Sequence, residues 1–257
     1  PQQHLVLAYS STGHGKTTFA LDAPGPICYN DIDLRALHAI KKAREDHGKV
    51  VFHNSVASVR KASVLTEEQV KAAGRKSFDA FTKAIEWACE QCKKGNVKTL
   101  VQDTGSELYQ LNMFAVFGRT DKIMKRDHGI PRHEFRSLTK IIRQSGLNLV
   151  LLCHQKEEYR NDAPTGKMTW AGFEDMGADV DTAVRLEMVN KKFQGETEKR
   201  TRFEMTVVKA GVNYLTFNET YTSDDWEGVG MGPFSYLAIQ TFDDSTPADW
   251  GVEIDES

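Results

Sequence analysis

The hydrophobic positions of the chain form short apolar runs separated by longer segments with helical spacing. Apolar runs typical of buried strands occupy residues 4–9, 27–30, 97–102 and 147–153. Residues 66–94 instead place apolar side chains at the spacing of an amphipathic helix. This alternation predicts an α/β fold with a mostly parallel central sheet, flanked by helices that form right-handed crossovers.

Weaker patterns predict the remaining elements of this sheet. A short strand is expected at residues 50–52, and two late strand segments at 183–189 and 202–209 indicate antiparallel strands at one edge. Residues 157–179 contain several Gly and Pro residues and are expected to form a loop. Further helices are expected over residues 34–45, 106–117 and 131–145. In such a sheet the active site lies at the carboxyl ends of the strands.

The charge distribution divides the chain into a basic body and an acidic end. The formal net charge of the 257 residues is −3, yet no Lys or Arg follows Lys209, and ten acidic residues lie in 210–257. We therefore expect one folded domain over residues 1–221 and an acidic, flexible tail over 222–257. The basic body could attract a polyanion, and the tail could recruit a basic partner or simply remain solvated.

Composition indicates a globular protein outside the membrane. Hydrophobic residues make up 40% and charged residues 27% of the chain, without an apolar run long enough to cross a bilayer. The first residues lack the pattern of a signal peptide, so a cytoplasmic location is expected. Cys89 and Cys92 have metal-like spacing but no second pair of ligands, and we expect ordinary thiols.

Residues 10–17 carry the strongest motif. They read Ser-Ser-Thr-Gly-His-Gly-Lys-Thr between an expected strand and an expected helix, which is the setting of a Walker A phosphate-binding loop, although Ser10 replaces the first Gly. Lys16 is placed to contact the β- and γ-phosphates and Thr17 to bind Mg²⁺. The expected cofactors are ATP and Mg²⁺, and the expected nucleotide-binding residues are Ser11, Thr12, Gly13, His14, Gly15, Lys16, Thr17 and Thr18.

Acidic residues at two strand ends extend this site. Asp103 ends the strand at 97–102 and is the candidate Walker B carboxylate, which would bind Mg²⁺ together with Thr17. Asp31 and Asp33 follow the second strand and would point to the same side. One of them could activate the attacking water, or they could cap the following helix.

Two polar residues end the strand at 147–153. His154 and Gln155 are placed where they could sense the γ-phosphate, and the alternative is an ordinary hydrogen bond in a loop. One crossover unit separates the phosphate loop from the Asp103 strand, and another separates the Asp103 strand from the strand that ends at Gln155. Both strand ends are therefore expected near the phosphate loop.

This order of features resembles the RecA-like P-loop ATPases, most closely the phage-encoded, core-only recombinase-like ATPases of the Sak type. The resemblance covers roughly residues 5–209. It implies that Asp33 activates water, with Asp in place of the family's Glu, and that Gln155 links the γ-phosphate to DNA-binding loops. It also implies that Lys209 acts from a neighbouring subunit of a homo-oligomeric ring or filament, although Gly211 replaces the second lysine of the family's pair.

The same resemblance implies contact between single-stranded DNA and the segment after Gln155. Basic side chains would neutralise phosphates there, and Tyr159 or Trp170 could stack on bases. The candidates are Lys156, Arg160, Lys167 and Trp170, with Lys122, Lys125, Arg126 and Arg132 as a second group. The expected function is a Mg²⁺-dependent ATPase in phage-type recombination or strand annealing, in the cytoplasm of a bacterial host.

Two other functions fit the same loop. A small-molecule kinase would need a lid rich in arginine, for which Arg119, Arg126, Arg132 and Arg136 are available. A nucleotide-controlled loading protein would instead use its acidic tail to bind a replication partner. Strand order separates the kinase architecture from the RecA-like one, because only the latter places the strand ending at Gln155 between the phosphate-loop strand and the Asp103 strand.

Overall fold

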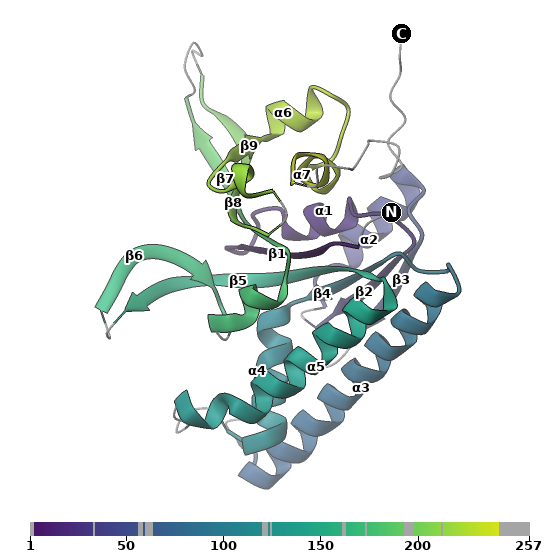
Figure 1. Cartoon of the computed structure of the whole chain (residues 1–257), viewed down its shortest axis with the longest axis vertical. Coiled ribbons are helices and arrows are strands. Elements are labelled where there is room, and N and C mark those ends of the chain that lie inside the picture. The colour runs from purple at the N-terminus through teal and green to yellow at the C-terminus, as the bar shows by residue number, and fades with distance from the viewer. Residues whose placement is uncertain are drawn as a thin grey trace.

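The computed structural model describes residues 3–32, 34–55, 59, 64–119, 123, 125–160, 163–172, 174–192, 198–211 and 213–241. Its centre is a nine-stranded sheet in the order β3-β2-β4-β5-β1-β7-β8-β9, with β6 paired to β5 (Figure 1). The strands are β1 (Leu5–Ser10), β2 (Ile27–Asp31), β3 (Val51–Ser55), β4 (Thr99–Asp103), β5 (Asn148–Arg160), β6 (Ala163–Trp170), β7 (Thr182–Lys191), β8 (Arg200–Ala210) and β9 (Thr220–Thr222).

Strand direction confirms the predicted α/β fold. Neighbouring strands from β3 to β7 are parallel, whereas β8 and β9 are antiparallel additions at one edge. Leu151 of β5 pairs with Leu7 of β1 on one side and with Gln102 of β4 on the other. The strand that carries Gln155 therefore lies between the phosphate-loop strand and the Asp103 strand, as expected for the RecA-like arrangement.

Helices cover both faces of the sheet and define two hydrophobic clusters. On one face pack α3 (Glu67–Lys93), α4 (Gly105–Phe117) and α5 (Gly129–Ser145), and on the other α1 (Lys16–Leu21), α2 (Leu37–His47) and α7 (Pro233–Thr241) (Figure 1). Successive β1 residues alternate between the clusters, since Leu5 and Leu7 belong to one and Val6 and Ala8 to the other. Burial on both faces explains why β1 is apolar at almost every position.

The predicted boundary between domain and tail lies too early. The helix α6 (Ser223–Glu227) and α7 follow Thr222, and Trp226, Phe234 and Leu237 are buried in the cluster formed with α1. These apolar side chains attach residues 223–241 to the domain despite the acidic residues around them. The remainder of the predicted tail lies outside the described residues.

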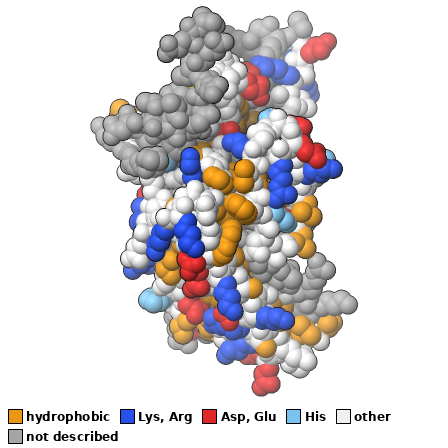
Figure 2. Space-filling model, turned by 90° about the vertical axis from the view of Figure 1, so that its right-hand side faces the viewer, with side chains coloured by type: hydrophobic (Ala, Val, Ile, Leu, Met, Phe, Trp, Pro, Cys, Tyr) orange, Lys and Arg blue, Asp and Glu red, His pale blue; other side chains and the backbone are white. Residues whose placement is uncertain are grey.

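The segment predicted as a loop at 157–179 is largely a β-hairpin. β5 continues beyond the sheet to Arg160 and pairs antiparallel with β6, so that the hairpin projects from the body (Figure 1). β3 and β9 are the two edges of the main sheet, and Phe52 of β3 packs edge-on against Trp87 of α3 with 5.6 Å between ring centroids. The face viewed in Figure 2 mixes hydrophobic side chains with Lys and Arg side chains. Within the described part of the chain, no helix is long and apolar enough to cross a bilayer.

Candidate functional site

The phosphate loop connects β1 to α1 through two glycines in the left-handed region. Gly13 has φ 86° and Gly15 has φ 84°, a conformation that is strained for residues with a Cβ. Gly15 also lies against Phe203 of β8, since a Cβ at Gly15 would be 3.2 Å from the ring. The left-handed backbone therefore favours Gly at both positions, and Gly15 also packs closely against the Phe203 ring.

Lys16 points into the loop that precedes it. Its ammonium donates hydrogen bonds to the carbonyl oxygens of Ser10 and Ser11, both at 3.0 Å, and to Ser10 Oγ at 3.1 Å, and only 9% of the residue is exposed. Ser10, the departure from the Walker pattern, thus supplies a side-chain acceptor. The arrangement holds a positive charge where a phosphate chain would lie in the loop.

Tyr29 joins the two expected Mg²⁺ ligands. Its hydroxyl donates to Asp103 Oδ2 at 2.5 Å and also hydrogen-bonds Thr17. Burial and the Asp103 carboxylate raise the pKa of Tyr29 well above its usual value, so the phenol keeps its proton. Thr17 and Asp103 supply oxygen donors of the kind that Mg²⁺ prefers, and these two residues would hold the ion.

A cavity of about 310 Å³ brings these groups together. Its size is close to the lower end of the roughly 300–1,000 Å³ typical of small-molecule sites. Sequence reasoning did not identify Arg35 and Phe203 as part of this site. The lining comprises Thr12, Gly13, Gly15, Lys16, Thr17, Thr18, Arg35, Asp103, Thr104, His154 and Phe203. Most of the predicted loop residues, the predicted Walker B carboxylate and His154 therefore line one cavity.

Of the two candidates for water activation, the structure describes Asp31 but not Asp33. Asp31 is completely buried, and its Oδ2 accepts from the Ala36 backbone N–H at 3.1 Å and lies 3.3 Å from His53 Nε2. These contacts fix the segment that leads into α2, although no side chain forms a capping hydrogen bond at the start of that helix. Asp33 lies outside the described residues, so its role as base stays a prediction.

Gln155 contacts the phosphate loop directly. Its Nε2 donates to Ser11 Oγ at 2.5 Å, while the preceding residue, His154, lines the cavity. β5 continues from this contact into the projecting hairpin without a break in the strand. This contact joins the phosphate loop to the strand that continues into the hairpin.

The predicted nucleic-acid residues occupy two environments on this hairpin. Lys156, Arg160 and Lys167 are exposed, with Lys156 donating to the Gly172 carbonyl at 3.2 Å and Arg160 paired with Glu158 at 3.1 Å. Trp170 instead packs at the base of the hairpin, edge-on to Tyr9 with 5.9 Å between centroids. In the second group, Lys122 lies outside the described residues.

Lys209 is engaged within its own chain. Its ammonium donates to the carbonyl oxygens of Gly177 at 2.6 Å and Ala178 at 3.4 Å, and also to that of Val180. Partial burial lowers its pKa. These bonds attach the end of β8 to the 3-10 turn at Glu174–Asp179. Action in a neighbouring subunit stays a prediction.

Comparison with known proteins identifies one family. The family model described as an AAA domain matches residues 3–207, a segment that runs from the start of β1 into β8 and includes the phosphate loop, Asp103 and Gln155. No curated protein matches the chain with significance.

Proposed function

We propose that this chain, which belongs to the AAA-domain family, hydrolyses ATP with Mg²⁺ and acts on single-stranded DNA. Its fold and its family both support a nucleotide-binding P-loop ATPase. The process would be phage-type recombination or strand annealing. In this proposal the active form is a homo-oligomer.

One observation carries the proposal. A single strand, β5, passes beside the phosphate loop, touches it through Gln155 and continues into the hairpin that exposes Lys156, Arg160 and Lys167. A change at the γ-phosphate can therefore reach basic side chains suited to the backbone of a nucleic acid. The position of β5 between β4 and β1 also favours this architecture over that of a nucleotide kinase.

The residues of the site have distinct parts in the proposed hydrolysis. Lys16 neutralises the β- and γ-phosphates from inside the loop, and backbone N–H groups around Gly13 and Gly15 surround the phosphate oxygens. Thr17 and Asp103 would hold Mg²⁺, which neutralises charge on the transferred phosphoryl group when bound. Asp33 is proposed to orient the attacking water. Such catalysis depends on positioning and electrostatic stabilisation rather than on a covalent intermediate.

The test is ATP hydrolysis by the intact protein and by Lys16→Ala, each with and without single-stranded DNA and with Mg²⁺ present. We expect turnover that DNA increases and that falls by at least about a hundredfold in the variant, because one transition-state charge contact is lost. DNA-independent turnover would leave an ATPase without the proposed substrate. An absence of turnover would overturn the enzymatic assignment and favour the nucleotide-controlled loading protein.

A further inference from the structure

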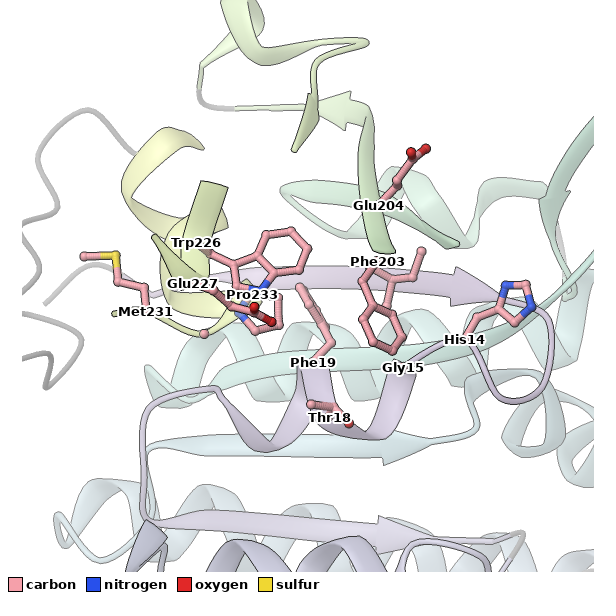
Figure 3. Close-up of a pocket in the computed structure, with 12 residues that line it drawn as sticks. His14, Gly15, Thr18, Phe19, Phe203, Glu204, Trp226, Glu227, Met231 and Pro233 are labelled. Carbon is pink, nitrogen blue, oxygen red and sulfur yellow. The ribbon is translucent and has the colours of Figure 1, made fainter. Parts of the chain in front are cut away.

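A second cavity, of about 270 Å³, lies beside the phosphate loop and is lined by His14, Gly15 and Thr18 among others. Its walls come from α1, from β8 and from the segment that contains α6 and the start of α7 (Figure 3). Phe19, Phe203 and Trp226 extend toward the space between these elements. The lining is mainly apolar, in contrast to the cavity that contains Lys16 and Asp103.

The two cavities adjoin at the loop. Gly15, Thr18 and Phe203 line both of them. Lys16, Thr17 and Asp103 define the end that would take the β- and γ-phosphates, so a nucleotide extending past Thr18 would bring its sugar and base to the second cavity. A charged cavity joined to an apolar one suits a ligand with a polyanionic end and an aromatic end.

We propose that this second cavity binds the nucleoside part of ATP, with the base packed on Phe203 and against the wall formed by Trp226. The inference rests on the proposed function, because it assumes that a nucleoside triphosphate occupies the phosphate loop. In this proposal the segment after Thr222, which contains α6 and the start of α7, takes part in nucleotide binding.

Phe203 is placed to stack on the base. It is 39% exposed, whereas Trp226 is 5% exposed and Phe19 only 1% exposed, so Phe203 has free ring surface and the other two form the wall behind. Its ring lies close to Gly15, since a Cβ added there would be 3.2 Å from the ring. Base–aromatic stacking is stabilising and tolerant of which base is present. The exposed carboxylate of Glu227 at the rim can accept hydrogen bonds from ribose hydroxyls.

The wall opposite α1 is held in place by Asp22. Its Oδ2 accepts from the Ser235 backbone N–H at 2.9 Å, and a Cβ at Gly232 would be only 2.0 Å from Oδ1. Phe19 and Phe234 add a ring contact with 5.3 Å between centroids. The cavity is thus already formed between fixed elements, which limits the ordering cost of binding.

The experiment compares ATP with inorganic tripolyphosphate, which offers the same phosphate chain without a nucleoside. Affinities are measured by calorimetry for the intact protein and for Phe203→Ala, Phe203→Trp and Lys16→Ala. We expect Phe203→Ala to weaken ATP about ten- to a hundredfold and tripolyphosphate far less, because only ATP stacks on the ring. Phe203→Trp should retain most of the ATP affinity, and Lys16→Ala should weaken both ligands.

Phe217→Ala is the matched control, since Phe217 is also an exposed phenylalanine but does not line the cavity. Equal weakening of the binding of both ligands by Phe203→Ala would mean that the substitution damages the phosphate loop, and this result would overturn the inference. Unchanged ATP binding by a Phe203→Ala variant with a native circular dichroism spectrum would overturn it as well. If the intact protein binds tripolyphosphate but not ATP, the nucleoside site is also wrong. If it binds neither, the proposed function itself fails.

Discussion

At the scale of single residues, Tyr29 organises the metal end of the site. Its protonated hydroxyl contacts both Thr17 and Asp103, the two residues expected to bind Mg²⁺. A buried carboxylate needs such donors when no cation is bound, because an uncompensated charge in the interior is costly. Tyr29 can therefore stabilise Asp103 in the absence of Mg²⁺ and hold it in position for the ion.

This role predicts that Tyr29→Phe destabilises the protein most when Mg²⁺ is absent. Loss of one hydrogen bond to a buried charged group should lower the free energy of unfolding by about 1–3 kcal/mol. Addition of Mg²⁺ and ATP should recover part of that loss, since the cation then compensates the carboxylate. Urea unfolding of the variant and the intact protein, with and without Mg²⁺ and ATP, measures both quantities.

Tyr159→Phe provides the control for this experiment, because the Tyr159 hydroxyl donates to the exposed Glu157 at 3.3 Å. Its removal should change stability by less than about 0.5 kcal/mol. A loss in Tyr29→Phe that is identical with and without Mg²⁺ and ATP would contradict the link between Tyr29 and the metal ligands.

Local motifs predicted part of this site and long-range packing determined the rest. Lys16 and Thr17 could be identified because a phosphate loop has fixed spacing, and Asp103 because it ends an apolar strand. Tyr29 and Phe203 had no such signal. Tyr29 reaches Asp103 through the pairing of β2 with β4, and Phe203 reaches Gly15 only after β8 joins the sheet.

At the scale of elements, the β5–β6 hairpin shows that pairing with a neighbouring strand can maintain a strand that is neither buried nor apolar. Inside the sheet β5 is buried from Leu149 to Cys153 and reads as a strand, but from Lys156 onward it is largely solvent-exposed and lacks an apolar pattern. Antiparallel pairing with β6, for example of Lys156 with Thr169, maintains the strand there. Pro164 and Gly166 suggested a loop, yet both are accommodated within the hairpin.

If this hairpin binds single-stranded DNA, the double substitution Arg160→Ala with Lys167→Ala should weaken binding and reduce its dependence on salt. Each lost phosphate contact should lower the slope of log affinity against log salt concentration by about 0.7. Fluorescence anisotropy of a labelled oligonucleotide across a salt series measures the slope. The same charge change on α2, Lys41→Ala with Lys42→Ala, is the control, and an equal effect of both pairs would indicate unspecific attraction.

At the scale of the whole molecule, α6 and α7 complete the domain rather than follow it. The acidic residues of this region suggested a tail, because charge dominates a composition average over a short segment. Burial is decided instead by a few positions, and Trp226 and Phe234 pack beside Phe19 on the helix that follows the phosphate loop. The place of the Gln155 strand between the phosphate-loop and Asp103 strands was implied by the RecA-like resemblance, whereas the docking of two short helices had no signal in the sequence.

This packing predicts that Phe234→Ala destabilises the entire domain. Phe234 is 1% exposed and lies against Phe19, so its truncation should cost about 3–5 kcal/mol through lost burial and the cavity left behind. Val229→Ala is the control in the same segment, because Val229 is 58% exposed and should change stability by less than about 0.5 kcal/mol. Denaturant unfolding followed by far-UV circular dichroism compares the two variants. If residues 223–241 were only a solvated tail, both substitutions would be equally neutral, and α7 could not serve as a wall of the nucleoside cavity.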